Sequence, residues 1–147
     1  MQYRQALERS LNNIMRSYEL FESGNQSLNT LHNALRDFLP MVMSELELTH
    51  LPKIKLSHVL DSHGQPSFGG FIPDDKSIRL AVDGRHPVDI CRTLAHELVH
   101  FKQNENNQLN PDSGETGSDE ENEANSVAGI IMRKFSKQFP EYITNQQ

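Results

Sequence analysis

The stretch Ile90-Cys91-Arg92-Thr93-Leu94-Ala95-His96-Glu97-Leu98-Val99-His100-Phe101 decides how the centre of this chain folds. Its apolar residues recur with the period of an α-helix, which predicts an amphipathic helix with one buried side. The residues on that side are Ile90, Cys91, Leu94, Ala95, Leu98, Val99 and Phe101. His96 and His100 fall together on the opposite side, so both imidazoles are expected to point away from the core. Pro87 suits the first turn of this helix, where a missing N–H costs nothing.

The segment from His96 to His100 has the pattern HExxH. Two histidines four residues apart lie one turn apart on the same face, where two imidazole nitrogens can bind one metal ion. Glu97 would sit beside that ion, and its carboxylate could take a proton from metal-bound water. The alternative is a chance match, in which the histidines are ordinary core residues with satisfied hydrogen bonds. Helical phase disfavours it, because the core side of the helix is already occupied.

A catalytic zinc usually has three protein ligands and one open position, so a third ligand is expected elsewhere. Residues 102–118 are polar and rich in turn formers, which predicts a loop that brings the chain back. Whether this loop is a lid, a tether or a processing site is open. A second helical pattern follows from Asp119, with the apolar stripe Ala124, Val127, Ala128, Ile131, Met132, Phe135 and Phe139.

Glu121 is the preferred third ligand. Glu120 and Glu121 lie at the two edges of the apolar stripe, while Glu123 falls well outside it. Asn125 favours Glu121, because it follows four residues later on the same face, where its amide could orient a ligand histidine. Glu120 is not excluded by phase. Glu121 could instead complete a capping box with Ser118, and the helix dipole alone would favour acids here.

These residues carry a resemblance to a known family. HExxH followed about twenty residues later by a helical Glu, with Asn four further on, is similar to the gluzincin zinc metallopeptidases. The string from Thr93 to Gln103 resembles small single-domain metallopeptidases of phages and bacteria, such as the SprT-like and ImmA/IrrE-like groups. The resemblance covers about residues 67–135 and implies Zn²⁺ bound by His96, His100 and Glu121, with Glu97 as general base. The metzincin pattern and the cysteines of a zinc ribbon are absent from the sequence.

A zinc-dependent endopeptidase is therefore the leading interpretation. The alternative is a non-catalytic module on a metallopeptidase scaffold, either a zinc-stabilised binding protein or a virion-assembly protein. Glu97 counts against it, because a purely structural site needs no general base. His86 and Tyr142 are candidate donors to the oxyanion of the reaction. The other histidines, His32, His50, His58 and His63, are predicted to be surface or turn residues.

The first third of the chain is predicted to form a helical hairpin, over residues 1–48. Its two apolar stripes are Tyr3, Leu7, Leu11, Ile14, Tyr18 and Phe21, and then Leu28, Leu31, Leu35, Phe38, Leu39, Val42 and Leu46. Residues 22–27 break the pattern, and Pro40 predicts a kink or a second break. The hairpin is expected to pack on a catalytic core at 53–140. A coiled-coil or oligomer seam is the alternative.

The β pattern lies between the helices. Residues 53–60 alternate like a strand, and 67–72 and 77–82 flank a turn at 73–76, which predicts a hairpin. The fold class is thus α+β, with a small antiparallel sheet ahead of the active-site helix and the C-terminal ligand helix. In the enzymes that this chain resembles, an edge strand binds the peptide substrate, so residues 67–82 are the candidate substrate edge. An ordinary hairpin, with glycines for a bulge or tight packing, is the alternative.

Composition bounds the remaining expectations. A chain of 147 residues with 35% hydrophobic content can bury one core, which predicts one compact domain over residues 1–147. A net charge of −6 without a basic run argues against a nucleic-acid partner. No apolar run is long enough for a membrane helix, and no signal peptide is apparent. Cys91, the only cysteine, reads as a core residue. We expect a protein of the cytoplasm, or of a virion if it is phage-encoded. The oligomeric state is open.

Overall fold

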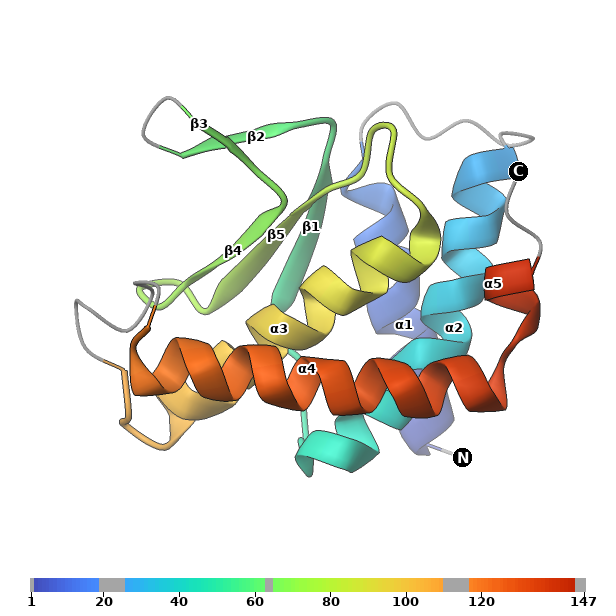
Figure 1. The fold of residues 1–147 in the computed structure, drawn as a ribbon. Helices are drawn as coiled ribbons and strands as arrows, with labels where there is room; N and C mark the ends of the chain where they lie inside the picture. The colour runs from blue at the N-terminus through green and yellow to red at the C-terminus, as the bar shows by residue number, and fades with distance from the viewer. Residues whose placement is uncertain (1, 19–25, 63–64, 110–116, 145–147) are drawn as a thin grey trace.

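The computed structural model describes residues 2–18, 26–62, 65–109 and 117–144. Over these residues the chain is a mixed α+β structure, in which helices and a small sheet enclose the central helix α3 (Figure 1). This confirms the predicted fold class. In chain order the elements are α1 (Gln2–Arg16), α2 (Gln26–Leu46), β1 (Lys53–Ser57), β2 (Leu60–Ser62), β3 (Gln65–Ser67), β4 (Gly69–Ile72), β5 (Ser77–Ala81), α3 (Pro87–Glu105), α4 (Asp119–Gln138) and α5 (Glu141–Thr144).

The N-terminal helical hairpin is present. Helices α1 and α2 lie side by side and pack against each other (Figure 1). The predicted stripes supply the contact, and the buried members are Leu11, Ile14, Leu28, Leu31, Leu35, Phe38, Leu39, Val42 and Leu46. Phe21 and most of the predicted break at 22–27 lie outside the described residues.

Pro40 was predicted to cause either a kink or a break, and the structure excludes the break. Helix α2 continues through Pro40 to Leu46. Pro40 itself is exposed, while Phe38, Leu39 and Val42 beside it are buried. Burial of these apolar neighbours offsets the hydrogen bond that proline cannot donate, so the helix persists.

The three-stranded sheet has the order β1-β5-β4, so β4 is an edge strand. Strands β4 and β5 form the predicted antiparallel hairpin, with Ile72 opposite Ser77. Strand β1 differs from the expectation of an antiparallel sheet, because it runs parallel to β5, with Ile54 opposite Ile78. The reason is the connection between β1 and β4. The antiparallel pair β2 and β3 carries the chain from β1 to the opposite edge, where β4 forms, and β5 then lies between β4 and β1. The predicted strand at 53–60 is accordingly split, since β1 ends at Ser57.

One hydrophobic cluster contains buried residues of the N-terminal helical hairpin, the sheet, α3 and α4. Every residue predicted on the core side of α3 is at most 3% exposed. Cys91 is among them, and burial raises the pKa of its thiol well above the ordinary value. The α4 stripe is also as predicted, with Val127 and Phe139 partly buried and the other members buried. No helix in the described ranges is long and apolar enough to cross a membrane.

Helix α3 is longer than expected. Residues 102–105, predicted as the start of a loop, form its last turn. Gln103 in this turn is 1% exposed, and Lys102 places a positive charge near the C-terminal end of the helix dipole. The predicted loop at 102–118 is therefore shorter at its start, and residues 110–116 lie outside the described residues.

Gly69 allows strand β4 to approach α3 closely. A Cβ atom at this position would lie 2.6 Å from Thr93 Cγ2 and 3.0 Å from the carbonyl oxygen of Arg79. We expect Gly69→Ala to lower the free energy of unfolding by about 1–3 kcal/mol, as overpacking of a tight contact does. Chemical denaturation measures the change.

Gly70→Ala is the matched control, because a Cβ atom there would meet nothing within 4 Å. Thr93→Ser in the Gly69→Ala background is expected to restore part of the stability. It removes Cγ2 and keeps the hydroxyl to which Arg85 donates. Equal stability of the two alanine variants would show that β4 does not approach α3 in this way.

Candidate metal centre

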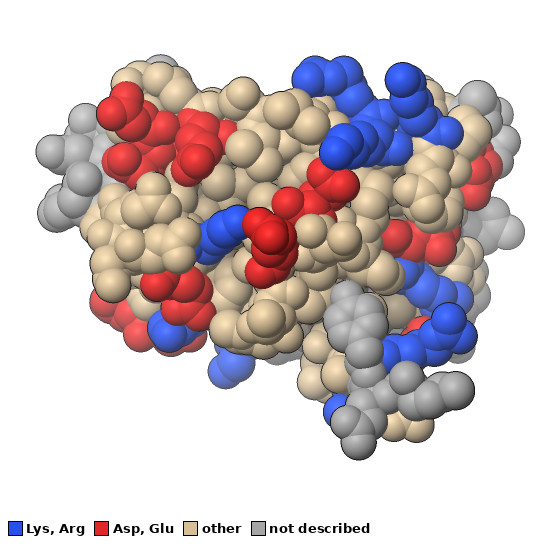
Figure 2. All heavy atoms as spheres, turned by 90° about the horizontal axis from the view of Figure 1, so that it is seen from below, with Lys and Arg blue, Asp and Glu red and all other residues tan. Residues whose placement is uncertain are grey.

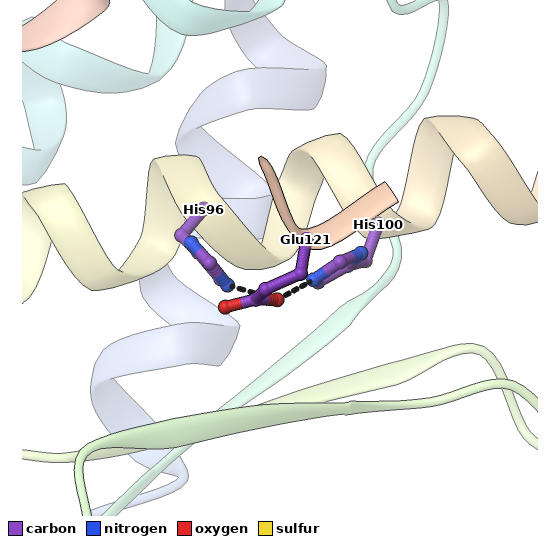
Figure 3. A group of neighbouring side chains, drawn as sticks. All are labelled: His96, His100 and Glu121. Atoms are coloured by element: carbon purple, nitrogen blue, oxygen red, sulfur yellow. Dashed lines mark hydrogen bonds and ion pairs between the residues drawn. The ribbon is translucent and has the colours of Figure 1, made fainter. Parts of the chain in front are cut away.

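Two helices bring three ligand side chains to one point (Figure 3). His96 and His100 project from α3 one turn apart, and Glu121 comes from the first turn of α4. Oε1 of Glu121 lies 3.1 Å from Nε2 of His96 and 2.9 Å from Nε2 of His100. The ligand atoms of the three residues all lie within 4.8 Å of one another. The sequence-predicted ligands therefore converge, although their role as ligands stays a prediction.

Small residues on α4 allow the two helices to pack closely at this point. Ala124 is 0% exposed and Ala128 is 3% exposed, and both belong to the core cluster that α3 shares. Glu121 precedes Ala124 by three residues, so the two side chains are neighbours on the same face of α4. Burial of the α4 stripe against α3 therefore delivers the Glu121 carboxylate to the histidines.

Glu121 takes part in the helix cap and in the cluster at once. Its backbone N–H donates to Oγ of Ser118 at 3.0 Å, so Ser118 is the N-cap of α4. Its carboxylate turns the other way, to the two histidines. The Ser118 cap uses only the backbone N–H of Glu121. Glu121 can therefore be part of this half of the capping box and still offer its carboxylate as a ligand. The cluster contains Glu121 and does not contain Glu120.

Glu97 is a buried carboxyl group next to the cluster. It is 8% exposed, and this burial raises the pKa of Glu97 to about 7 in the metal-free protein. The positive charge of a protonated His100 lowers this pKa, while the negative charge of Glu121 raises it further. A carboxyl group that titrates near neutrality is well suited to accept and return a proton at physiological pH.

The surroundings of His96 favour its neutral form. Burial lowers the pKa of His96, and the proximity of His100 lowers it further. The carboxylate of Glu121 and a hydrogen bond with the Asn125 side chain act in the opposite direction on this pKa. Asn125 is therefore a partner of a candidate ligand, as its position four residues after Glu121 predicted. Neutral imidazole is the form that binds a metal ion.

Gln103 is a functional candidate that sequence reasoning missed. Its Oε1 lies 2.7 Å from Nδ1 of His100, and its amide group reaches across to α4. Gln103 was missed because residues 102–118 were predicted to form a loop. The spacing could have found it, because Gln103 follows His100 by three residues and so shares its face once the helix is extended.

The two predicted oxyanion donors do not reach the centre. Nδ1 of His86 accepts from the Val88 N–H at 3.0 Å as the N-cap of α3, about 15 Å of helix before His96. The Tyr142 hydroxyl donates to Oδ2 of Asp37 at 2.5 Å, and burial raises the pKa of Tyr142. Tyr142 belongs to α5, at the opposite end of α4 from Glu121 (Figure 1). The prediction is therefore wrong for both residues, which serve the fold instead.

The remaining histidines make contacts away from the centre. His32 lies beside Arg36, and Nε2 of His50 donates to Glu105 at 3.1 Å. Nδ1 of His58 lies 2.9 Å from Oδ2 of Asp83. These three match the prediction of surface or turn positions, and His63 lies outside the described residues. Across the described part of the chain, His96, His100 and Glu121 form the one His/Cys/Asp/Glu group with metal-binding spacing.

Strand β4 runs beside the helix segment that carries the motif. Gly69 meets Thr93 one turn before His96, and the Phe71 ring lies 6.1 Å from the ring of Phe101, next to His100. The outer edge of β4 pairs with no strand among the described residues. An unpaired edge of this kind presents free N–H and C=O groups to another extended chain.

Arg85 ties this edge strand to the motif helix. Its side chain is 7% exposed and donates to the carbonyl oxygens of Phe68 at 3.0 Å and Ala81 at 2.7 Å. It also donates to Thr93 Oγ1 at 2.6 Å and to Asp89 Oδ2 at 2.9 Å. The Arg85 guanidinium therefore joins the start of β4, the end of β5 and the second turn of α3.

The donor set fits a divalent transition metal. Two imidazole nitrogens and one carboxylate oxygen are a common ligand set of catalytic zinc, and related ions accept the same donors. No protein-family model, curated protein or solved structure matches this chain. The resemblance to gluzincins accordingly stays an expectation from the motif residues.

Proposed function

We propose that this protein is a zinc-dependent metallopeptidase that cleaves internal peptide bonds. His96, His100 and Glu121 would hold the metal ion. The observation that carries the proposal is the convergence of their three ligand atoms within 4.8 Å beside the buried carboxyl group of Glu97. When bound, zinc supplies Lewis acidity, which activates water and polarises a carbonyl group.

Glu97 acts as the general base and then as the general acid. Its carboxyl group lies close enough to His100 and Glu121 for their charges to act on it. The buried Glu97 carboxyl beside the cluster would take a proton from the attacking water and return it to the leaving amine.

The substrate is a protein or peptide that binds along β4. Its backbone would add a strand to the open edge and hydrogen-bond with β4. Two features of β4 and its flank support this. Gly70 leaves open space where a side chain would stand, and Phe68, 66% exposed, presents a ring held 4.5 Å from the Arg85 guanidinium.

The surface charge agrees with a protein partner rather than a nucleic acid. The net charge is −6. On the face seen in Figure 2, acidic and basic side chains are both present, and the basic ones lie in several separate places among the acidic ones. Binding to a phosphate backbone calls for a basic stripe or patch over the whole interface. We place the reaction in the cytoplasm, or in a virion if the protein is phage-encoded.

Metal content is the first test of the proposal. Protein purified without added metal is expected to contain about one zinc ion per chain by elemental analysis, as one three-ligand site requires. Removing the metal with a chelator is expected to lower the thermal stability. When the free zinc concentration is 100 times the dissociation constant, binding raises the free energy of unfolding by about 2.7 kcal/mol.

The double variant His96→Ala, His100→Ala is the control, and its unfolding should not respond to chelator. Metal-free protein that takes up no zinc and unfolds identically with and without chelator would reject the metal site. Peptide-bond cleavage is then sought with the zinc-loaded protein on unfolded protein substrates. Mass spectrometry should find internal cleavage products that chelator abolishes.

A further inference from the structure

We infer that Gln103 is a positioning residue that keeps a hydrogen atom on Nδ1 of His100 and so leaves Nε2 for the metal ion. Glu123 on α4 holds Gln103 in the orientation that this requires. The inference rests on the proposed function for the identity of the ligand. The position of the hydrogen atom can be tested without any metal.

The contacts of Gln103 are short and buried. Gln103 is 1% exposed, and the side chain of His100 is 10% exposed. Oε1 of Gln103 lies 2.7 Å from Nδ1 of His100. Nε2 of Gln103 donates to the carbonyl oxygen of Glu120 at 3.0 Å and to Oε1 of Glu123 at 2.6 Å. Every polar atom of this amide therefore has a defined partner.

Those partners determine which way the Gln103 amide faces. The Glu120 carbonyl and the Glu123 carboxylate are both acceptors, so only the NH₂ group of Gln103 can face them. Turning the amide over would bring its oxygen against two other oxygens, at 3.0 Å and 2.6 Å, and would lose both of these hydrogen bonds. The oxygen of Gln103 must then face His100. An oxygen that can only accept requires that Nδ1 of His100 carries hydrogen.

This arrangement serves the metal centre through the geometry of His100. With hydrogen on Nδ1, the nitrogen that can give its lone pair to a metal ion is Nε2, which would exchange its hydrogen bond to Glu121 for the metal. The hydrogen bond also fixes the plane of the imidazole ring. Residues that hydrogen-bond a metal ligand typically contribute about 10–100-fold to metal affinity.

The same turn of α4 supplies both the candidate ligand and the anchor of Gln103. Glu121 provides the carboxylate of the centre, while Glu120 and Glu123 on either side of it bind the Gln103 amide. Glu123 is exposed at the surface, and yet one of its oxygens reaches the buried amide. Docking of α4 on α3 therefore positions Glu121 and orients His100 in one step.

The test uses Gln103→Leu, which keeps a buried side chain of similar size and removes every hydrogen bond. Zinc affinity, measured by competition with a chromophoric chelator, is expected to fall about 10–100-fold. Metal-free protein labelled with ¹⁵N is examined by NMR at neutral pH. In the wild type, His100 Nδ1 is expected to carry a hydrogen that exchanges slowly with water. In Gln103→Leu, this protection is expected to be lost.

Two further variants separate positioning from general damage. Glu123→Gln keeps an oxygen that can accept from Gln103, so affinity near the wild-type value is expected. Glu123→Ala removes the anchor from the surface without opening the core, so it is expected to weaken zinc binding and speed the exchange of the Nδ1 hydrogen. It also serves if Gln103→Leu fails to fold. Asn104→Leu, the same kind of change one residue away, is the control and should alter neither measurement.

Either measurement can overturn the inference. It is wrong if wild-type His100 carries no hydrogen on Nδ1, or if Gln103→Leu and Glu123→Ala leave both zinc affinity and Nδ1 exchange unchanged. Failure of the proposed metal site, on which the proposed function depends, gives a different result. Wild-type protein would then bind no zinc, while the protected Nδ1 hydrogen of His100 would still depend on Gln103.

Discussion

Glu97→Gln is expected to abolish peptide hydrolysis while zinc remains bound. The amide occupies the same volume as the carboxyl group but cannot accept the proton of the attacking water. Loss of a general base typically lowers the rate by about 10²–10⁴-fold, so kcat should fall by that factor. The ligands His96, His100 and Glu121 are untouched, so the zinc content of the variant should equal that of the wild type. Both quantities are measured on the same preparation.

Burial makes Glu97→Gln a clean experiment. Because the Glu97 carboxyl is buried and its pKa is raised to about 7, its ionised form is disfavoured in the metal-free fold. A neutral amide removes that cost, so the variant is not expected to unfold more easily. Glu141→Gln is the matched control, with the same chemical change at an exposed position of α5. Hydrolysis by Glu97→Gln at the wild-type rate would exclude Glu97 as the general base, whereas zinc-loaded wild-type protein that cleaves no peptide would favour a non-catalytic, zinc-stabilised module.

Glu121→Ala is expected to remove zinc binding almost completely. Its carboxylate oxygen Oε1 contacts both histidines, at 3.1 Å from Nε2 of His96 and 2.9 Å from Nε2 of His100. Loss of a direct ligand should reduce affinity by more than the roughly 10–100-fold typical of an outer partner. Chelator competition measures the affinity. Helix α4 should survive the change, because Ser118 caps the backbone N–H of residue 121, which alanine also has.

Glu120→Ala is the matched control for the choice between the two neighbouring acids. It removes a carboxylate from the same turn and keeps the backbone carbonyl that binds Gln103. Zinc affinity should stay close to that of the wild type. A larger loss in Glu120→Ala than in Glu121→Ala would make Glu120 the third ligand. Unchanged affinity in both would mean that zinc does not bind at this cluster.

Local spacing accounts for the part of the site that the sequence predicted correctly. His96 and His100 face away from the core because residues on one helix keep a constant angular relation. The same reasoning identified the stripe of α4, with Glu121 at its edge and Asn125 one turn later. His86 and Tyr142 were chosen by residue type without a spacing to support them, and the fold uses both elsewhere.

The sequence by itself determined the helices α3 and α4, the β4–β5 hairpin and the side of α3 on which the histidines lie. Each of these depends on the periodicity of a short segment, which is local physics. Only the tertiary structure decided that Glu121 rather than Glu120 meets the histidines, that Gln103 is buried against α4, and that β1 runs parallel to β5. These three features depend on how segments far apart in the chain pack together. Helical phase leaves the docking of α4 on α3 open, and burial of the apolar stripes of both helices decides it.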